Sequence, residues 1–104
     1  MVWKLFIDDE RYPVHENEWT IARDFDDAAF LVLKQGVPVC ISFDHDLGHG
    51  PTGYDFAKWF CNYIVDNEIE LPKNFQYYVH SMNPVGRENI RIYMDKFLNT
   101  FNKK

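Results

Sequence analysis

The fold is decided by a stretch in the middle of the chain, VCISFDHD at residues 39–46, where an apolar run ends abruptly in three polar side chains. Two further stretches have the same form. VWKLFI at residues 2–7 continues into DDER, and FQYYV at residues 75–79 continues into HSMN. Short, nearly all-apolar runs are typical of parallel strands that are covered on both faces. We therefore predict three strands that each end in a polar cluster.

Helical patterns separate these runs. Asp24 or Asp26 can cap a first helix, which Gly36 ends. Residues 54–67 carry an apolar stripe at helical spacing, and the clearest 3.6-residue period follows Asn83. The three strands are thus joined and followed by helices.

A fourth, β-prone strand is predicted at residues 19–23, which makes the element order β, β, α, β, α, β, α. Alternating strands and helices favour a parallel sheet with helices on both faces, and right-handed crossovers give the strand order 2-1-3-4. We predict one domain over residues 1–104: a small, truncated, doubly wound α/β domain, a three-layer sandwich with a mostly parallel four-stranded sheet.

Composition limits the classes of function. Eleven basic and sixteen acidic residues give a net charge of −5, so general binding to nucleic-acid backbone is not expected. No apolar run is long enough to span a membrane and no secretory leader is recognisable, so we expect a soluble, cytoplasmic protein. Cys40 and Cys61 lie in apolar patterns and are expected to be buried, reduced thiols.

The polar clusters are expected to meet, because the carboxyl ends of parallel strands lie side by side and form the ligand crevice of open α/β sheets. Neighbouring carboxylates at such an edge can hold a divalent cation. The predicted metal ligands are Asp8, Asp9, Asp44 and Asp46, with Mg²⁺ or Mn²⁺ as the ion. An acidic loop that faces solvent is the alternative.

The candidates for catalysis are Asp44, His45 and His80. A carboxylate at the end of a central strand can act as a metal ligand, a nucleophile or a general base. Two histidines on either side of a scissile phosphate bond can act as general acid and base. The alternative is that the aspartates organise a turn and that His80 is a hydrogen-bonded core residue.

Phosphate ligands are predicted from residues with hydrogen-bond donors near the strand ends. They are Arg11, Thr52, Gly53, Ser81, Asn83 and Arg87. Arg11 could clamp a phosphate in a bidentate manner or hold the carboxylates. Thr52 could instead cap the helix that follows it, and a surface position is the alternative for Arg87.

Three motifs resemble the receiver-like family described as cyclic-phosphate-processing. They are LFIDDER at residues 5–11, SFDHDLG at residues 42–48 with TG at residues 52–53, and HSMNPVG at residues 80–86. The resemblance implies a receiver-like fold and action on cyclic phosphates such as those left by RNA cleavage and repair. It departs from an ordinary receiver domain in two respects: the chain ends in a helix where a fifth strand with a lysine is expected, and a histidine precedes Ser81.

These features favour a small phosphoesterase whose ligand is a nucleotide or ADP-ribose cyclic phosphate. Two alternatives fit the same residues. One is a non-catalytic receiver-like module that binds Mg²⁺ and accepts a phosphoryl group on Asp44 or docks a partner protein, and the other sequesters a cyclic nucleotide without turnover. A small phosphorylated ligand is expected in each case except protein docking, and no oligomeric state is predicted.

Overall fold

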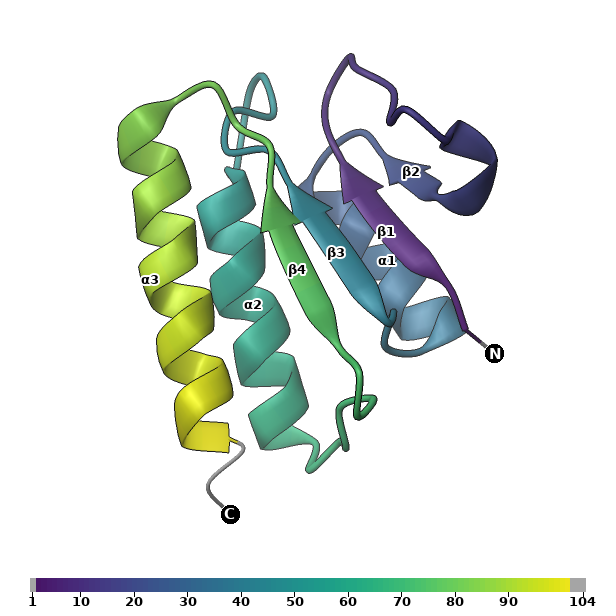
Figure 1. Ribbon diagram of the computed structural model, residues 1–104, viewed down its shortest axis with the longest axis vertical. Coiled ribbons are helices and arrows are strands. Elements are labelled where there is room, and N and C mark those ends of the chain that lie inside the picture. The colour runs from purple at the N-terminus through teal and green to yellow at the C-terminus, as the bar shows by residue number, and fades with distance from the viewer. Residues whose placement is uncertain (1, 102–104) are drawn as a thin grey trace.

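The computed structural model describes residues 2–101, which form one parallel sheet and three α-helices. The strands are β1 Lys4–Ile7, β2 Thr20–Ala22, β3 Cys40–Phe43 and β4 Gln76–Val79. Neighbouring strands are parallel throughout and their order is β2-β1-β3-β4, as Figure 1 shows. The predicted α/β class, the parallel sheet and its strand order are confirmed.

The helices begin where the sequence offers capping side chains. They are α1 Phe25–Gln35, α2 Gly53–Asp66 and α3 Pro84–Phe101, with a short 3₁₀ helix, η1 Glu16–Glu18, between β1 and β2. The Asp24 carboxylate accepts a hydrogen bond from the Asp27 N–H at 2.8 Å and caps α1. Gly36 ends this helix with a φ of 86°, a conformation that glycine adopts without the strain of a side chain.

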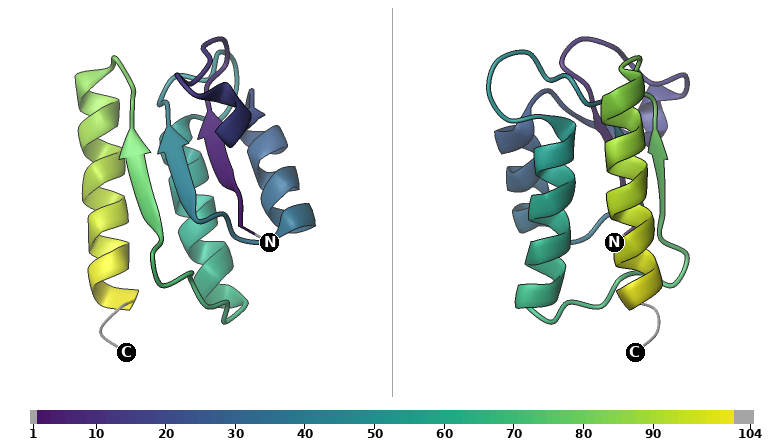
Figure 2. Two further views of the ribbon diagram at one scale, coloured as in Figure 1. Left: turned by 45° about the vertical axis from the view of Figure 1, so that its right-hand side comes forward. Right: turned by 90° about the vertical axis from the view of Figure 1, so that its left-hand side faces the viewer.

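The layering differs from the expectation of helices on both faces. Both α1 and α2 cover one face of the sheet, and α3 lies beside the edge strand β4 next to α2 (Figures 1 and 2). In the described part of the chain no α-helix covers the opposite face. The connection between β1 and β2, on that side in Figure 2, has Pro13 and no apolar helical period, so it forms only η1.

The core lies between the sheet and the helices. Leu5 and Ile7 of β1 and Ile41 and Phe43 of β3 point into it, because alternate side chains of a strand share a face. Helical core residues include Val32 of α1, Phe56, Phe60 and Ile64 of α2, and Ile90 and Met94 of α3.

The two cysteines are free and buried, as expected. Burial raises the pKa of the Cys61 thiol to about 12, so this side chain behaves as a protonated, apolar group.

Between residues 2 and 101, no helix combines the length and the apolar character needed to cross a membrane.

Candidate functional site

The register of the sheet brings three strand ends to the same level. Ile7 of β1 pairs with Phe43 of β3, and Phe43 pairs with Val79 of β4. The next residues are Asp8, Asp44 and His80. The ladder continues through them, because the Asp44 N–H donates to the carbonyl of Ile7 at 3.0 Å and the His80 N–H donates to that of Phe43 at 2.9 Å.

The side chains of these three residues converge. One possible metal-ligating atom from each of Asp8, Asp44 and His80 lies within 4.8 Å of the other two. The guanidinium of Arg11 joins them from the loop after β1. We call Asp8, Arg11, Asp44 and His80 the strand-end cluster.

Asp8 is the buried centre of the cluster, with no exposed surface. Its Oδ1 accepts hydrogen bonds from the N–H groups of Glu10 and Arg11, both at 2.9 Å. Its Oδ2 accepts from Nε of Arg11 and Nε2 of His80, both at 3.0 Å. Burial raises the pKa of Asp8, but these hydrogen bonds and the Arg11 charge outweigh burial, so the pKa is lowered and the carboxyl is ionised at neutral pH.

His80 is fixed on three sides. Its ring stacks on Phe6, with centroids 4.4 Å apart and an angle of 6° between the planes. Nδ1 lies 2.7 Å from Oγ of Ser42. Because Oδ2 of the ionised Asp8 can only accept, we assign the ring proton to Nε2 and the Ser42 hydroxyl as the donor to Nδ1. Burial lowers the pKa of His80 despite the opposing charges of Asp8 and Asp44, so the imidazole is neutral at neutral pH.

Arg11 connects the two carboxylates, which is one of the two roles predicted for it. Its Nη2 lies 3.6 Å from Oδ2 of Asp44, and its side chain is 43% exposed. Oδ1 of Asp44 accepts the backbone N–H of His45 at 2.8 Å. Oδ2 of Asp44 therefore has the weaker contacts and faces the exposed guanidinium.

A bend after Asp44 sends His45 and Asp46 away from the strand-end cluster. Nδ1 of His45 lies 3.2 Å from Oδ1 of Asp46, and Nδ2 of Asn83 lies 3.4 Å from the other oxygen of that carboxylate. The His45 ring packs on the first turn of α3, where a Cβ at Gly86 would come within 2.2 Å of Cγ. The two histidines predicted to face each other across a phosphate thus have separate sets of partners.

The predicted phosphate ligands before α2 are engaged within the chain. Oγ1 of Thr52 accepts the Asp55 N–H at 3.2 Å, and the Asp55 carboxylate accepts the Thr52 N–H at 2.8 Å, which together form a capping box. The N–H of Gly53 donates to the carbonyl of His45 at 2.8 Å. A Cβ at Gly53 would lie 1.8 Å from the carbonyl oxygen of Asp44, so glycine is needed for this close approach.

The predicted ligands before α3 organise the start of that helix. Ser81 is buried, and its Oγ accepts the N–H of Asn83 at 3.1 Å. The Asn83 side chain in turn accepts the N–H of Gly86 at 3.0 Å and caps α3. Arg87 lies on the exposed surface of the first turn. Asp9, predicted as a metal ligand, is also exposed.

The donor set of the strand-end cluster fits a divalent cation. Carboxylate oxygens of Asp8 and Asp44 suit Mg²⁺ or Mn²⁺. The imidazole of His80 suits Mn²⁺ better than Mg²⁺, and it would bind an ion only with its ring proton moved from Nε2 to Nδ1. Asp46 belongs to the neighbouring group around His45 and Asn83. Of the four predicted metal ligands, the structure thus brings Asp8 and Asp44 together.

Three supporting residues were not identified from the sequence. Ser42 and Phe6 hold His80, and Nη1 of Arg23 donates to the carbonyls of Asp8 and Arg11 at 3.0 and 2.8 Å. Ser42 could have been found, since it is the one polar side chain inside the apolar run at residues 39–43. Phe6 and Arg23 carry no such signal, because each acts through a contact that only the folded chain makes.

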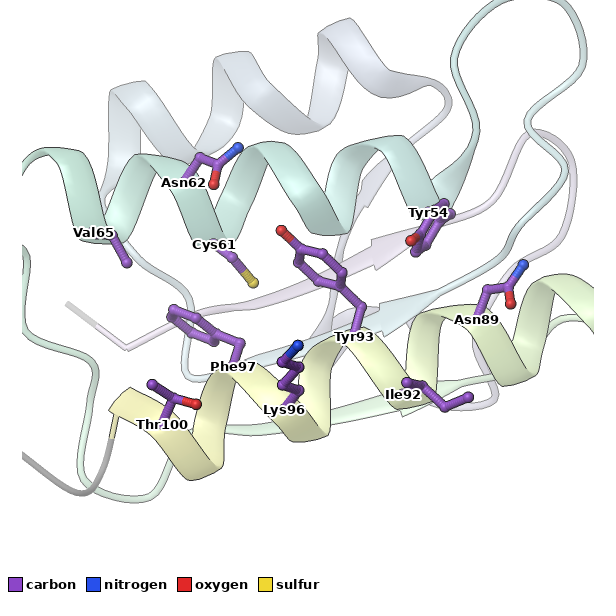
Figure 3. Close-up of a pocket in the computed structure, with 10 residues that line it drawn as sticks. All are labelled: Tyr54, Cys61, Asn62, Val65, Asn89, Ile92, Tyr93, Lys96, Phe97 and Thr100. Atoms are coloured by element: carbon purple, nitrogen blue, oxygen red, sulfur yellow. The ribbon is translucent and has the colours of Figure 1, made fainter.

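A separate cavity of about 480 Å³ lies between α2 and α3 (Figure 3). Tyr54, Cys61 and Val65 line it from α2, and Tyr93 and Phe97 line it from α3. None of the lining residues belongs to the strand-end cluster. We place the functional site at the cluster, because the ionisable groups converge there.

Comparison with solved structures supports the fold. A chain titled as the yeast Spc42 trimeric coiled coil, amino acids 181–211, in a fusion, matches with a TM-score of 0.56 and 22% sequence identity. The match covers 89% of the present chain and 63% of that chain. At this identity the likeness concerns the fold alone. A search of the curated proteins finds no match.

Comparison with protein families gives a match over most of the chain. The model of the cyclic-phosphate processing receiver domain covers residues 3–96. This range includes all four strands and the complete strand-end cluster. The chain therefore belongs to the family of cyclic-phosphate processing receiver domains.

Proposed function

We propose that this protein is a phosphoesterase that hydrolyses a cyclic phosphate, of the kind found on a nucleotide or ADP-ribose after RNA cleavage and repair. The observation that carries the proposal is the convergence of Asp8, Asp44 and His80 with Arg11 at the ends of adjacent strands. The family description supplies the substrate class. Hydrolysis opens the ring: an oxygen of water bonds to phosphorus, the bond to one ester oxygen breaks, and that oxygen takes a proton to give a monoester.

Arg11 is the group that we assign to the phosphate. A cyclic phosphate diester carries one negative charge, and a guanidinium offers several N–H donors in one plane. Nε of Arg11 is held by Asp8, while the side chain is 43% exposed and can present its remaining donors to solvent. Asp8 thus orients Arg11 for an anion that approaches from the open edge.

Asp44 is the group that we assign to proton removal from the attacking water. Its carboxylate is 9% exposed, and Oδ2 has Arg11 at 3.6 Å, longer than a hydrogen bond. That oxygen can accept a proton from a water held beside the phosphate. The backbone N–H of His45 keeps the carboxylate in place through Oδ1.

His80 is assigned to holding Asp8, and through it the Arg11 guanidinium, in position. Its Nε2–H is donated to Oδ2 of Asp8, and the Ser42 hydroxyl fixes this tautomer through Nδ1. Arg11, oriented by Asp8, is then the fixed donor where charge develops on the phosphoryl oxygens in the transition state. The ring contacts of His45 are with Asp46 and the first turn of α3, so we give His45 a positioning role through its backbone.

A divalent cation has a place in this scheme. Asp8 and Asp44 would hold Mg²⁺ or Mn²⁺, and His80 would become a further ligand for Mn²⁺ only with its ring proton moved from Nε2 to Nδ1. Such an ion, when bound, supplies Lewis-acid stabilisation of phosphoryl charge. Arg11 already brings a positive charge to the same carboxylates, and His80 brings a hydrogen-bond donor. Comparing the rate of hydrolysis with a metal ion and with EDTA therefore measures whether the activity depends on a metal.

A second function is favoured by one observation. Asp44 follows β3 directly, and its Oδ2 has a single, long contact with Arg11, whereas both oxygens of Asp8 accept hydrogen bonds. A phosphoryl acceptor needs such an available carboxylate oxygen. The cation beside it is Arg11 and not the lysine of ordinary receiver domains. Incubation with acetyl phosphate followed by mass spectrometry would detect an acyl phosphate on Asp44, which the hydrolase proposal does not expect to accumulate.

Phosphorus NMR of the purified protein tests the proposal. The substrates are adenosine 2′,3′-cyclic phosphate and ADP-ribose 1″,2″-cyclic phosphate, each with Mg²⁺, with Mn²⁺ and with EDTA. We expect the cyclic signal to be replaced by a monoester signal. Line broadening without a new signal would instead indicate sequestration, and an unchanged spectrum in all conditions would contradict the proposal.

A further inference from the structure

The sheet face without a helix carries a second cavity, of about 360 Å³. Arg11 and His80 of the strand-end cluster form part of its lining. The rest comes from β1, from the loop at residues 12–15 and from Trp19. The cavity is therefore continuous with the site at which a phosphate would bind, and its volume is typical of small-molecule pockets.

One wall of this cavity is a row of aromatic rings. Phe6 stacks on His80 on one side and meets Trp19 edge to face on the other, with centroids 5.9 Å apart and an angle of 73°. The row starts at a residue of the strand-end cluster and leads away from it. Lys4 lies over the ring of Trp19, with Nζ 5.3 Å from the centroid, and its charge is paired with Glu18 at 3.7 Å.

The mouth of the cavity exposes apolar side chains. Tyr12 is 64% exposed and Val14 is 94% exposed, and both line the cavity. The guanidinium of Arg23 lies 4.6 Å from the centroid of the Tyr12 ring, which holds the ring at the rim. Arg23 also donates to the carbonyls of Asp8 and Arg11, so the same side chain ties the rim to the strand-end cluster.

We propose that this cavity, formed by Phe6, Tyr12, Val14 and Trp19 beside Arg11 and His80, binds the base of a nucleoside cyclic phosphate. This inference rests on the proposed phosphoesterase function and narrows its substrate class. A base is flat and aromatic, so it can stack on the exposed ring of Tyr12 irrespective of its identity, while the attached phosphate reaches Arg11. Cyclic phosphates that lack a base fill none of the cavity.

The test compares two cyclic phosphates with the same five-membered ring. Adenosine 2′,3′-cyclic phosphate has a base and glycerol 1,2-cyclic phosphate has none. We expect kcat/KM for the nucleotide to exceed that for the glycerol ester by tenfold or more. In Tyr12→Ala the KM for the nucleotide should rise about fivefold or more, as expected for loss of a stacking partner. Equal kcat/KM values for the two esters would overturn the proposal.

Two further variants keep the test specific. Tyr78→Ala removes a tyrosine that is 54% exposed and does not line the cavity, so it should leave the KM for the nucleotide unchanged. Trp19→Phe keeps an aromatic ring at the wall and should change KM less than Tyr12→Ala. A rise in KM in Tyr78→Ala equal to that in Tyr12→Ala would contradict a role for the cavity.

Failure of this inference is distinguishable from failure of the phosphoesterase proposal. If both esters are hydrolysed equally, the catalytic proposal stands and the cavity has no role in base binding. If neither is hydrolysed, NMR titration with adenosine alone still tests the cavity. A shift of the Trp19 indole N–H signal supports base binding, and an unshifted signal at millimolar adenosine overturns it.

Discussion

Asp8 and His80 are 72 residues apart in the chain, and Nε2 of His80 donates a hydrogen bond to Oδ2 of Asp8 across 3.0 Å. The bond joins the ends of β1 and β4, which are separated by β3 in the sheet. It also orients the His80 ring, which Ser42 and Phe6 hold from the other sides. The stability of the sheet edge and the geometry of the proposed site thus depend on the same pair.

Replacement of Asp8 by asparagine tests this dependence. The amide is uncharged, and one of its two terminal groups is a donor that would face the donors of Arg11 or His80. We expect Asp8→Asn to lower the free energy of unfolding by about 1.5–3 kcal/mol, the range for hydrogen bonds to a charged group. Urea denaturation measures this. The neighbouring Asp9 is exposed, so Asp9→Asn should change stability by less than about 0.5 kcal/mol.

The lowered pKa of His80 predicts that acid weakens the fold. In the unfolded chain this imidazole takes up a proton as the pH falls through its ordinary value of 6.5, whereas the folded protein binds the proton only at lower pH. The unfolded state then holds more protons, so the free energy of unfolding decreases as pH falls below about 6.5 and levels off below the folded pKa.

His80→Gln provides the control for this pH dependence. Glutamine does not titrate, so the slope of stability against pH just below 6.5 should become smaller in the variant than in the native protein. The lowered pKa of Asp8 acts in the same direction but only in more acidic solution, below its ordinary value of 3.8. Identical slopes in the two proteins between pH 6.5 and 5 would show that His80 is not the group responsible.

The sheet could be predicted because its signals are local. The run at residues 39–43 contains β3, the run at residues 75–79 contains β4, and the caps at Asp24, Thr52 and Asn83 mark the helix starts. Strand order followed from the handedness of crossovers. The sequence pattern did not predict the uncovered face, because the apolar side chains of a strand do not reveal whether a helix or a loop covers them.

The candidate site was predictable only in part. Placing Asp8, Asp44 and His80 together required only the register of parallel strands. The separation of His45 and Asp46 from them depends on a bend after Asp44, and the alternation of an extended strand does not predict a bend. The role of Ser42 was missed because the hydroxyl binds a ring nitrogen 38 residues away in the chain.

The close contact between Gly86 and His45 predicts that alanine at position 86 destabilises the fold, although helix propensity alone would favour alanine. Alanine is favoured over glycine in a helix by about 1 kcal/mol. A Cβ at position 86 would nevertheless lie 2.2–2.7 Å from three atoms of the His45 side chain. We expect Gly86→Ala to destabilise the fold by about 1–3 kcal/mol, as overpacking does, in thermal or urea denaturation.

Asn89→Ala is the matched control, since Asn89 is an exposed residue of the same helix. It should be neutral or slightly stabilising in the same measurement. A stabilising Gly86→Ala would mean that the His45 ring moves freely and does not pack against α3.

The capping box at Thr52 predicts a loss of stability without a loss of phosphate affinity. Its hydroxyl accepts the Asp55 N–H, so Thr52→Ala should lower the free energy of unfolding by about 1 kcal/mol. Thr100→Ala, an exposed threonine near the end of α3, serves as the control. An increase in KM for a cyclic phosphate with unchanged stability would show that Thr52 binds phosphate instead.

The most direct test of the central claim compares two neighbouring aspartates. Asp44 belongs to the strand-end cluster, and Asp46 pairs with His45 and Asn83 outside it. The measurement is the initial rate of adenosine 2′,3′-cyclic phosphate hydrolysis by the native protein, Asp44→Asn and Asp46→Asn, with equal folded fractions verified by circular dichroism. We predict that Asp44→Asn lowers kcat by about a hundredfold or more, the scale of a general base, and that Asp46→Asn stays within about threefold of the native rate. Equal rates for the native protein and Asp44→Asn would contradict the account.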